Sequence, residues 1–473
     1  RFMKIEQIYT GCLAHAAYYL ESKGEAAIFD PLREVDPYIQ RAKKDNAKIK
    51  YVFETHFHAD FVSGHLDLKK KTGAEIVFGP TAKPGYEALV AKDNQIFDVG
   101  DYKVKVIHTP GHTMESTTYL LIDEKGKEHG IITGDTLFIG DVGRPDLAQH
   151  VVSELTEEKL AAHLYDSLRN KIMPLGDELI IYPNHGAGSA CGKMMSKETT
   201  DTLGHQKKVN YALRADMTKE EFIKELLTGL TAPPGYFPQN VLMNIKGYES
   251  LDDVIERGER PLSSEAFELE ADKNDALILD TRNAKDFAKG HIPNSINIGL
   301  DGSFAQWVGE IVPDVNQKIL LVTYPGKEEE AITRLSRVGY DKTIGFLEGG
   351  FDRWIKDRRT VERIKRITVD QFQKAYFGEG PLVFDVRKKS EFDSEHIEGA
   401  INIPLNELED NLWQFPKDKP FVIHCAGGYR SMIAASILMN NGWEDFVDVI
   451  EGFDGMKNTN IPRSEYICPT TML

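Results

Sequence analysis

Two histidines and an aspartate lie within one short turn of the chain. His56, His58 and Asp60 directly follow an apolar run that begins at Tyr51 and predicts a buried strand. Turns at strand ends are where a rigid scaffold usually carries its reactive side chains. Imidazole and carboxylate groups at this spacing are typical metal ligands, so this turn predicts part of a metal site.

Three further turns carry the same kinds of side chain. His112 lies in HTPGHT, Asp135 in TGDT and His185 in YPNHG, each after a strand-like run. One histidine on a turn is more often a capping or solvated residue than a ligand. Several such groups at separate strand ends, beside glycines that let the backbone come close, are hard to explain by packing. We therefore predict that these turns meet at a metal.

A cysteine loop near the carboxyl end predicts a second kind of chemistry. Four residues separate Cys425 from Arg430, and Gly427 and Gly428 lie between them, before an expected helix from Met432. Such a tight loop can point its backbone amides inward, and the helix amino terminus adds positive potential. This environment favours a thiolate and a negatively charged persulfide on it. The loop predicts a reactive Cys425 with Arg430 as its anion-binding partner.

The second half of the chain contains an internal repeat. The segment from Leu277 matches the segment from Leu382 at a constant offset of 105 residues. The first copy has Tyr324 or one of its neighbours where the cysteine should be, and acidic residues 328–330 where an anion should bind. We expect this copy to be catalytically silent, with a spacer or docking role. The matched pairs are Asp280 with Asp385, Arg282 with Arg387, His291 with His396 and Asn297 with Asn402.

Length and pattern predict three domains. A chain of 473 residues is too long for one core. Residues 3–230 alternate strand-like runs with loops and end in an amphipathic helix that starts with a capping box at Thr218 and Glu221. Residues 231–260 begin with three prolines in a short span and are interpreted as a linker. The two repeat copies then occupy residues 261–361 and 362–473. The expected strands of the first domain are residues 26–29, 51–54, 75–78, 102–107, 117–122, 130–133 and 178–182.

Composition excludes several classes of protein. A formal charge of −17 argues against nucleic-acid binding, which needs a basic face. No apolar run is long enough to span a membrane, and the amino end has no secretory signal, with Met3 as the natural start. Four cysteines without a CxxC pair indicate neither a disulfide framework nor a thiolate zinc site. We expect a cytoplasmic protein without membrane contact, and a homo-oligomer; for Cys12 and Cys468 no special role is expected.

The motif set THxHxD, TPGHT, TGDT and GRPD resembles the metallo-β-lactamase superfamily over residues 3–215. This resemblance implies an αββα sandwich with its metal at one edge. Hydrolytic members hold two zinc ions, and the second ion needs a histidine directly after the aspartate. This chain has Phe61 there, which makes a dinuclear hydrolase a weaker interpretation.

Within that superfamily the chain resembles the persulfide dioxygenases, which keep one Fe(II) per chain. The resemblance implies His56, His112 and Asp135 as ligands. Two histidines and one carboxylate leave positions for O₂ and substrate together. His58, Asp60 and His185 would then orient ligands or hold water by hydrogen bonds.

Three residues of two nearby loops are tentative substrate-binding candidates. Arg144 could form a structural ion pair with Asp141 or Asp146, or it could bind an anionic thiol carrier such as glutathione or coenzyme A. Cys191, in HGAGSACGK, could be a small buried residue. It lies between glycines and before Lys193, so we expect a favoured thiolate with a role in persulfide handling.

The cysteine loop resembles the rhodanese active site. Four residues separate its cysteine from its arginine, whereas a phosphatase loop of related fold needs five to surround a phosphate, so the spacing favours sulfur as the bound group. The whole chain resembles bacterial fusions of a persulfide dioxygenase with a silent and an intact rhodanese domain, both α/β with central parallel sheets. The resemblance implies oxidation of a low-molecular-weight persulfide by O₂ to sulfite and thiol, with sulfur transfer that forms or uses thiosulfate, in sulfide detoxification. Two alternatives are a zinc-dependent thioester hydrolase of the glyoxalase II kind fused to a sulfur-carrier module, and a non-catalytic persulfide carrier or sensor.

Overall fold

The computed structural model describes residues 3–147 and 155–468. They form two compact units. One comprises Arg1–Asp253 with Leu335–Tyr340, and the other Val254–Arg334 with Asp341–Leu473. The first unit contains the predicted metal site, and the second contains both copies of the repeat except Leu335–Tyr340.

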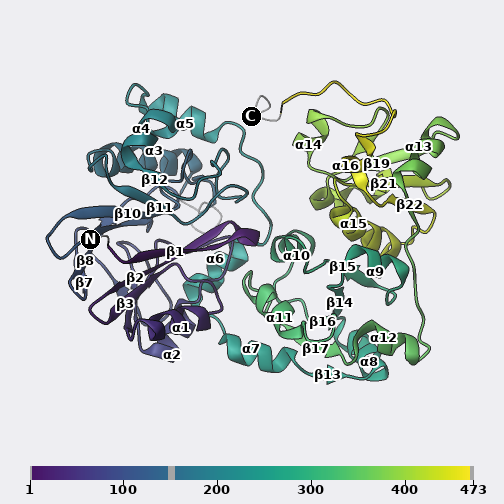
Figure 1. Cartoon of the computed structure of the whole chain (residues 1–473), viewed down its shortest axis with the longest axis horizontal. Helices are drawn as coiled ribbons and strands as arrows, with labels where there is room; N and C mark the ends of the chain where they lie inside the picture. The colour runs from purple at the N-terminus through teal and green to yellow at the C-terminus, as the bar shows by residue number, and fades with distance from the viewer. Residues whose placement is uncertain (1–2, 148–154, 469–473) are drawn as a thin grey trace. The chain divides into compact units, whose positions relative to one another are not determined.

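The first unit is built on two six-stranded sheets (Figure 1). In the first sheet β1, β2 and β3 are antiparallel, and β3 to β6 are parallel. In the second sheet β10 and β11 pair in parallel, whereas all other neighbours are antiparallel. The first sheet contains β1 Ile5–Thr10, β2 His15–Ser22, β3 Glu25–Phe29, β4 Lys48–Phe53, β5 Glu75–Phe78 and β6 Leu89–Val90; the second contains β7 Ile96–Val99, β8 Tyr102–His108, β9 Thr117–Ile122, β10 Glu128–Gly134, β11 Ile180–Pro183 and β12 Asp201–Thr202.

Apolar side chains fill the space between the two sheets, as the half-buried alternation of the strands requires. Tyr18 and Phe53 of the first sheet pack with Tyr119 and Ile132 of the second. Helices α1, α2 and α6 cover the outer face of the first sheet, and α3 and α5 cover that of the second. The predicted αββα sandwich is therefore confirmed. The helices are α1 Asp36–Lys44, α2 His65–Thr72, α3 Glu157–Ser167, α4 Leu203–Val209, α5 Lys219–Leu227, α6 Phe237–Lys246 and α7 Leu251–Gly258.

The interpretation of residues 231–260 as a linker is wrong. Helices α6 and α7 occupy most of this stretch, and α6 has Pro238 in its first turn, where a missing N–H costs nothing. Val241 and Ile245 pack against the first sheet, and Asn244 donates hydrogen bonds to the carbonyls of His58 and Phe61. Helix α6 thus belongs to the first unit and holds in place the turn that carries His56, His58 and Asp60, which we call the metal turn.

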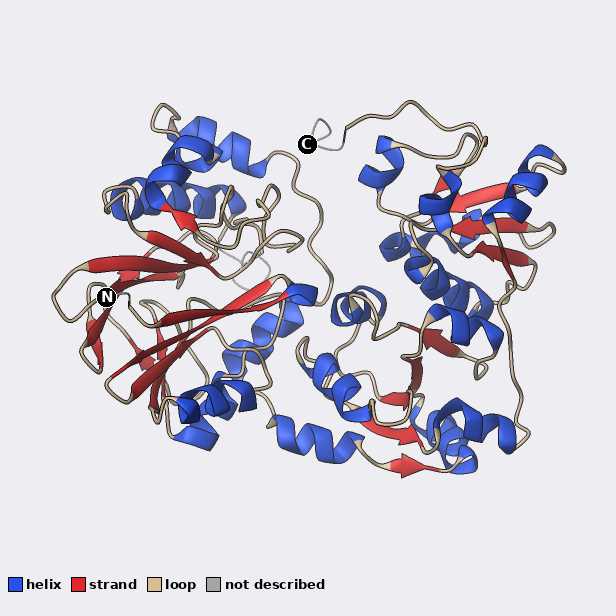
Figure 2. Ribbon diagram, viewed as in Figure 1, coloured by secondary structure: helices blue, strands red, loops and turns tan. Residues whose placement is uncertain are grey.

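Each copy of the repeat is a five-stranded parallel sheet flanked by helices, as predicted (Figure 2). The strand orders, β13-β17-β16-β14-β15 and β18-β22-β21-β19-β20, are identical between the copies. The first copy contains β13 Pro261–Leu262, β14 Leu277–Asp280, β15 Ser295–Asn297, β16 Ile319–Val322, β17 Thr343–Leu347, α8 Ser264–Asn274, α9 Ala284–Lys289, α10 Phe304–Ile311, α11 Glu328–Ser336 and α12 Gly350–Lys356. The second contains β18 Arg366–Ile367, β19 Leu382–Asp385, β20 Ile401–Asn402, β21 Phe421–His424, β22 Phe446–Val449, α13 Val369–Phe377, α14 Lys389–Ser394, α15 Tyr429–Asn440 and α16 Gly452–Met456.

The strands predicted from the sequence coincide with β3, β4, β5, β8, β9, β10 and β11 to within a few residues. The capping box of α5 is present at Thr218 and Glu221. Within the described part of the chain, no helix combines the length and the apolar character needed to cross a membrane.

Candidate metal centre and thiol loop

Three strand ends bring His56, His112 and Asp135 together. His56 follows β4, His112 lies in the turn between β8 and β9, and Asp135 follows β10. Nε2 of His56 lies 3.6 Å from Oδ2 of Asp135, and Nε2 of His112 lies 3.2 Å from the same oxygen. All three side chains are buried. Their ligand atoms therefore converge on one point.

The other ring nitrogens of the two histidines are occupied. Nδ1 of His56 lies 3.0 Å from Oγ1 of Thr55, whose hydroxyl donates to Asp30. Nδ1 of His112 lies 2.8 Å from the carbonyl of Arg144 and donates to it. Because these contacts fix the ring orientations, each Nε2 is directed at the carboxylate and can offer its lone pair to a metal.

One carboxylate oxygen of Asp135 accepts a hydrogen bond, and the other has no hydrogen-bond partner. Oδ1 lies 2.8 Å from Nδ1 of His185, whereas the buried Oδ2 has no hydrogen-bond partner. An unpaired buried carboxylate oxygen is costly, and a bound cation would satisfy it. The residues therefore fit a single metal ion bound by two imidazoles and one carboxylate.

His185 and Asp60 form the support behind Asp135. Nε2 of His185 lies 2.6 Å from Oδ2 of Asp60, so the imidazole bridges two carboxylates. Burial disfavours the imidazolium, but Asp135 and Asp60 outweigh this and raise the pKa of His185 to about 10. The chain Asp60–His185–Asp135 fixes the position of the carboxylate that faces the predicted metal.

His58 points away from that convergence. Its Nε2 lies 2.9 Å from Oδ1 of Asp30 and 3.0 Å from Oε2 of Glu54, and its ring centroid lies 4.3 Å from that of His56. His58 therefore packs beside a predicted ligand, and Asp30 connects it to the Thr55 hydroxyl that orients His56. Asp30 and Glu54 directly follow β3 and β4, but they are not among the sequence candidates, because neither belongs to a recognisable local motif.

Phe61 occupies the place beside Asp60 where a second metal ligand would lie. Its ring is fully buried, 4.5 Å from the ring centroid of His58 and 4.4 Å from that of His15. An apolar ring here fills space and offers no donor. The turn accordingly provides His56 as a ligand for one ion. It provides no imidazole at position 61 for a second ion.

Arg144 forms the structural ion pair. Its Nε and Nη2 each lie 2.6 Å from the Asp146 carboxylate, its Nη1 contacts the carbonyl of Ala190, and it is buried. The Lys193 ammonium donates to the carbonyls of Glu225 and Thr228. Neither cation is directed at an open position where it would meet an anionic substrate.

The expectation of a favoured thiolate at Cys191 is wrong for this structure. The side chain is buried, and burial, reinforced by Asp60 and Asp135, raises the pKa of its thiol well above the usual value. Cys191 does lie beside the metal site, because its sulfur is within 4.8 Å of ligand atoms of Asp60 and His185.

The thiol loop follows β21 and wraps the sulfur of Cys425. The backbone N–H of Gly428 donates to Sγ at 3.1 Å, and the thiol lies 3.4 Å from Oγ of Ser431. Gly428 has a φ of +101°, which favours glycine, and a Cβ there would lie 2.9 Å from the carbonyl oxygen of Ile450. The glycines thus permit the inward-facing amide predicted from the sequence.

The Arg430 guanidinium is paired with a carboxylate. Its two terminal nitrogens lie 2.7 and 3.0 Å from the carboxylate of Glu391 on α14. Asp385 binds Arg387 in the same bidentate way, as Asp280 binds Arg282 in the first copy. Arg430 therefore anchors the start of α15, and the contact to the sulfur comes from Gly428 and Ser431.

The first copy has Thr323 at the position of Cys425. Asp280 pairs with Val322 as Asp385 pairs with His424, so the next residues, Thr323 and Cys425, are equivalent. The adjacent Tyr324 hydroxyl donates to Asp286, and α11 begins with three glutamates. The structure thus identifies which neighbour of Tyr324 replaces the thiol.

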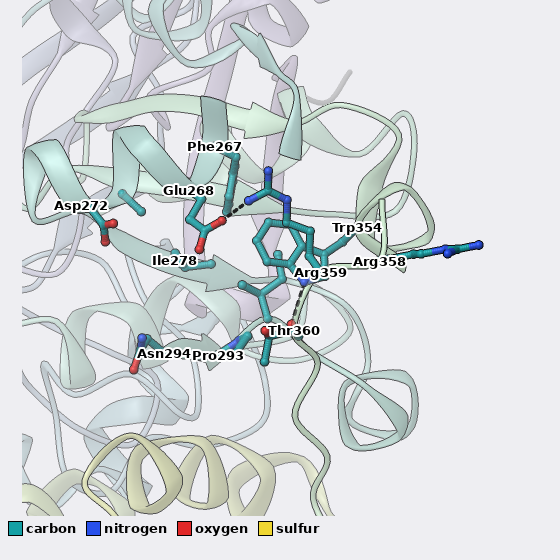
Figure 3. A pocket seen from close by; sticks show the side chains of 12 residues that line it. Phe267, Glu268, Asp272, Ile278, Pro293, Asn294, Trp354, Arg358, Arg359 and Thr360 are labelled. Atoms are coloured by element: carbon teal, nitrogen blue, oxygen red, sulfur yellow. Dashed lines mark hydrogen bonds and ion pairs between the residues drawn. The ribbon is translucent and has the colours of Figure 1, made fainter. Parts of the chain in front are cut away.

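A cavity of about 330 Å³ lies on the first copy, near the start of β14, where Ile278 contributes to its wall (Figure 3). Phe267 and Trp354 line it together with an ion pair between Glu268 and Arg359. It lies away from the strand end that carries Thr323 and has no part of either predicted site.

Comparison with known proteins supports the domain organisation. Residues 10–185 match the model of the metallo-β-lactamase superfamily, and residues 263–357 and 368–459 each match the rhodanese-like domain. A crystal structure described as a metallo-β-lactamase from Staphylococcus aureus is 31% identical, with a TM-score of 0.64, over 73% of this chain and 99% of that one.

Two curated relatives each match less than half of this chain. A probable hydroxyacylglutathione hydrolase of Schizosaccharomyces pombe is 28% identical over 204 residues, which is 42% of this chain and 74% of that protein. A hydroxyacylglutathione hydrolase of Rhizobium etli is 37% identical over 164 residues, 34% of this chain and 56% of that protein. The chain therefore spans little more than half the length of the Rhizobium relative. The chain belongs to the metallo-β-lactamase superfamily and carries two rhodanese-like domains after that fold.

Proposed function

We propose that the first unit is a persulfide dioxygenase that uses one Fe(II) to oxidise a low-molecular-weight thiol persulfide, such as that of glutathione or coenzyme A, to sulfite and thiol. The observation that carries this proposal is the convergence of His56, His112 and Asp135, with Phe61 in place of a further ligand. Two histidines and one carboxylate are the ligand set of non-haem iron oxygenases.

The residues around that point have defined tasks in the proposal. Asp60 and His185 hold Asp135, the carbonyl of Arg144 orients His112, and Thr55 orients His56. When bound, the iron supplies the activation of O₂. The buried surroundings exclude bulk water, which keeps a reactive persulfide from side reactions.

The second copy of the repeat is proposed to transfer sulfane sulfur through Cys425, with thiosulfate as product or source. The Gly428 amide and the Ser431 hydroxyl contact the sulfur and would stabilise negative charge on it. Coupling persulfide oxidation with sulfur transfer in one chain suits a role in sulfide detoxification.

The second candidate is a zinc thioester hydrolase, favoured by the hydroxyacylglutathione hydrolases among the relatives. Against it stands Phe61, which replaces the imidazole expected after Asp60 with an apolar ring. Metal analysis separates the two candidates, because the hydrolase requires two zinc ions per chain, and the dioxygenase one iron.

Two substitutions in the full chain test the proposal. Cys425→Ser should abolish thiosulfate turnover and leave oxygen uptake on supplied persulfide close to that of the wild type. Asp135→Ala should abolish oxygen uptake and leave thiosulfate turnover. Loss of both activities in either variant would contradict two separate sites.

A further inference from the structure

The cavity on the first copy, which neither proposed reaction uses, has an apolar wall and a charged rim. Phe267, Ile292 and Trp354 contribute buried side chains to the wall. At the rim, Glu268 on α8 and Arg359 form an ion pair and are both partly exposed (Figure 3). Its volume of about 330 Å³ lies at the small end of the range for ligand pockets, roughly 300–1,000 Å³. This space is sufficient for one small molecule.

In the second copy a tyrosine spans the equivalent place. The repeat offset of 105 residues also relates the N-caps of α8 and α13, so Ala271, which lines the cavity, corresponds to Tyr376. The Tyr376 hydroxyl donates a hydrogen bond of 2.9 Å to the carbonyl of Glu398. Glu398 corresponds to Pro293, which also lines the cavity. Tyr376 therefore bridges the two positions between which the first copy is open.

A backbone difference adds to this opening. In the second copy the N–H of Glu398 donates to the carbonyl of Pro462 at 2.9 Å. Pro293 has no N–H and cannot form the equivalent bond. The corresponding carbonyl in the first copy, that of Thr360, accepts a hydrogen bond of 2.8 Å from Nε1 of Trp354 instead. Alanine and proline thus replace both the ring and the backbone contact that close the second copy.

We propose that the cavity binds a small molecule with a phenol-like ring, in the place that the second copy fills with Tyr376. The ring packs on the aromatic side chains of Phe267 and Trp354, which gain contact with an apolar partner. Its hydroxyl donates to the carbonyl of Pro293, as Tyr376 donates to that of Glu398. The first copy thereby has a binding task that needs neither a thiol nor a metal.

The charges at the rim suit an uncharged ligand. Glu268 and Arg359 neutralise each other, and Arg358 points away from the other lining side chains (Figure 3). An anionic ligand would therefore meet the Asp272 carboxylate without a cation to balance it. A phenol is neutral at pH 7, because its pKa is near 10, and it needs no such partner.

The test measures binding of p-cresol, which is the tyrosine side chain as a free molecule, to the full chain by a saturation-transfer NMR titration. A ligand this small should bind with a dissociation constant on the order of 1 mM. Ala271→Tyr gives the first copy the side chain that fills the second, so the dissociation constant should rise by about tenfold or more. Ala271→Leu fills part of the same space and serves if the tyrosine variant fails to fold.

Two comparisons make the test specific. Leu269→Tyr adds the same ring to α8 at an exposed position outside the cavity wall and should leave the dissociation constant unchanged. 4-Methylanisole has a methoxy group in place of the hydroxyl and cannot donate to the carbonyl of Pro293. It should bind the wild type about fivefold more weakly than p-cresol.

Three results would overturn the proposal: no saturable binding of p-cresol, equal binding by the wild type and a folded Ala271 variant, or equal affinity for p-cresol and 4-methylanisole. The titration needs no persulfide, sulfur donor or metal. Its outcome is therefore independent of both proposed reactions.

Discussion

Phe61 is proposed to determine how many metal ions the first turn can bind. Its ring fills the space between His58 and His15, beside Asp60, whose Oδ1 has no hydrogen-bond partner. Phe61→His should therefore increase bound zinc from about one to about two ions per chain after loading of metal-free protein, because Asp60 and His185 gain an imidazole partner. Metal analysis by mass spectrometry gives the count.

A matched variant tests whether extra zinc binding needs a histidine at position 61 or only an additional histidine in the same turn. Phe57 lies in the same turn, but its ring packs on Phe78 at 4.6 Å. Phe57→His should leave the zinc content unchanged. Equal zinc in both variants would show that the identity of residue 61 does not control the second ion.

Asp448 gives the second copy a distinctive dependence of stability on pH. Burial raises the pKa of its carboxyl, on β22, from 3.8 to about 6 in the folded chain. The folded state therefore binds the proton more tightly than the unfolded state, and this contribution to stability is lost as the pH rises from about 4 to above 6. By proton linkage, the free energy of unfolding should be lower above that pH range by on the order of 3 kcal/mol.

Asp448→Asn removes this loss. The melting temperature of the variant relative to the wild type should therefore rise between pH 4 and pH 7, as measured by calorimetry. Asp370→Asn, on the exposed start of α13, should show no such trend. If the melting temperature of Asp448→Asn relative to the wild type fell with increasing pH, the argument that burial raises the pKa of Asp448 would be contradicted.

Residue types at strand ends were enough to predict that these turns meet, but not which polar groups hold the ligands. The family resemblance implied His56, His112 and Asp135 as the ligand set, and the ligand atoms of these three residues lie close together. The sequence alone left the role of Arg144 open and favoured a thiolate at Cys191. Arg144 pairs with Asp146, and Asp60 and Asp135 help to raise the pKa of Cys191; these contacts arise from folding and are not marked by a local motif.

At the scale of elements, a close approach of two loops shapes the thiol site. Gly452, at the start of α16, has a φ of +58°, and a Cβ there would lie 2.6 Å from the carbonyl oxygens of Cys425 and Ala426. Gly452→Ala should therefore displace the thiol loop, abolish sulfur transfer and lower stability by several kcal/mol, as measured by urea unfolding.

Gly399 provides the control for backbone conformation alone. Its φ is +86°, but a Cβ there would meet nothing within 4 Å. Gly399→Ala should cost about 1 kcal/mol and keep sulfur transfer. If both variants lost the same stability and activity, the contact between Gly452 and the loop would not matter.

Strands and repeats were predictable because periodic burial is a local property of the sequence. Helix α6 was not, because its three preceding and internal prolines resemble a linker. What stabilises it is tertiary contact, since Val241 and Ile245 pack on the first sheet and Asn244 binds the metal turn. A proline in a first helical turn does not exclude a helix.

At the scale of the whole molecule, one chain combines the proposed oxidising metal centre with a thiol that is proposed to carry sulfur, and the first copy of the repeat has Thr323 in place of that thiol. The first copy keeps the sheet order and the Asp280–Arg282 pair of the second. It lacks the groups that contact sulfur, so folding and sulfur chemistry depend on different residues within the same fold.

The most direct test of the central claim is oxygen uptake by iron-loaded protein with glutathione persulfide, measured beside thioester cleavage with S-lactoylglutathione on the same preparation. The account predicts persulfide-dependent oxygen consumption with sulfite formation, at one iron per chain, and no thioester cleavage. Thioester cleavage with two zinc ions per chain and no oxygen uptake would contradict it.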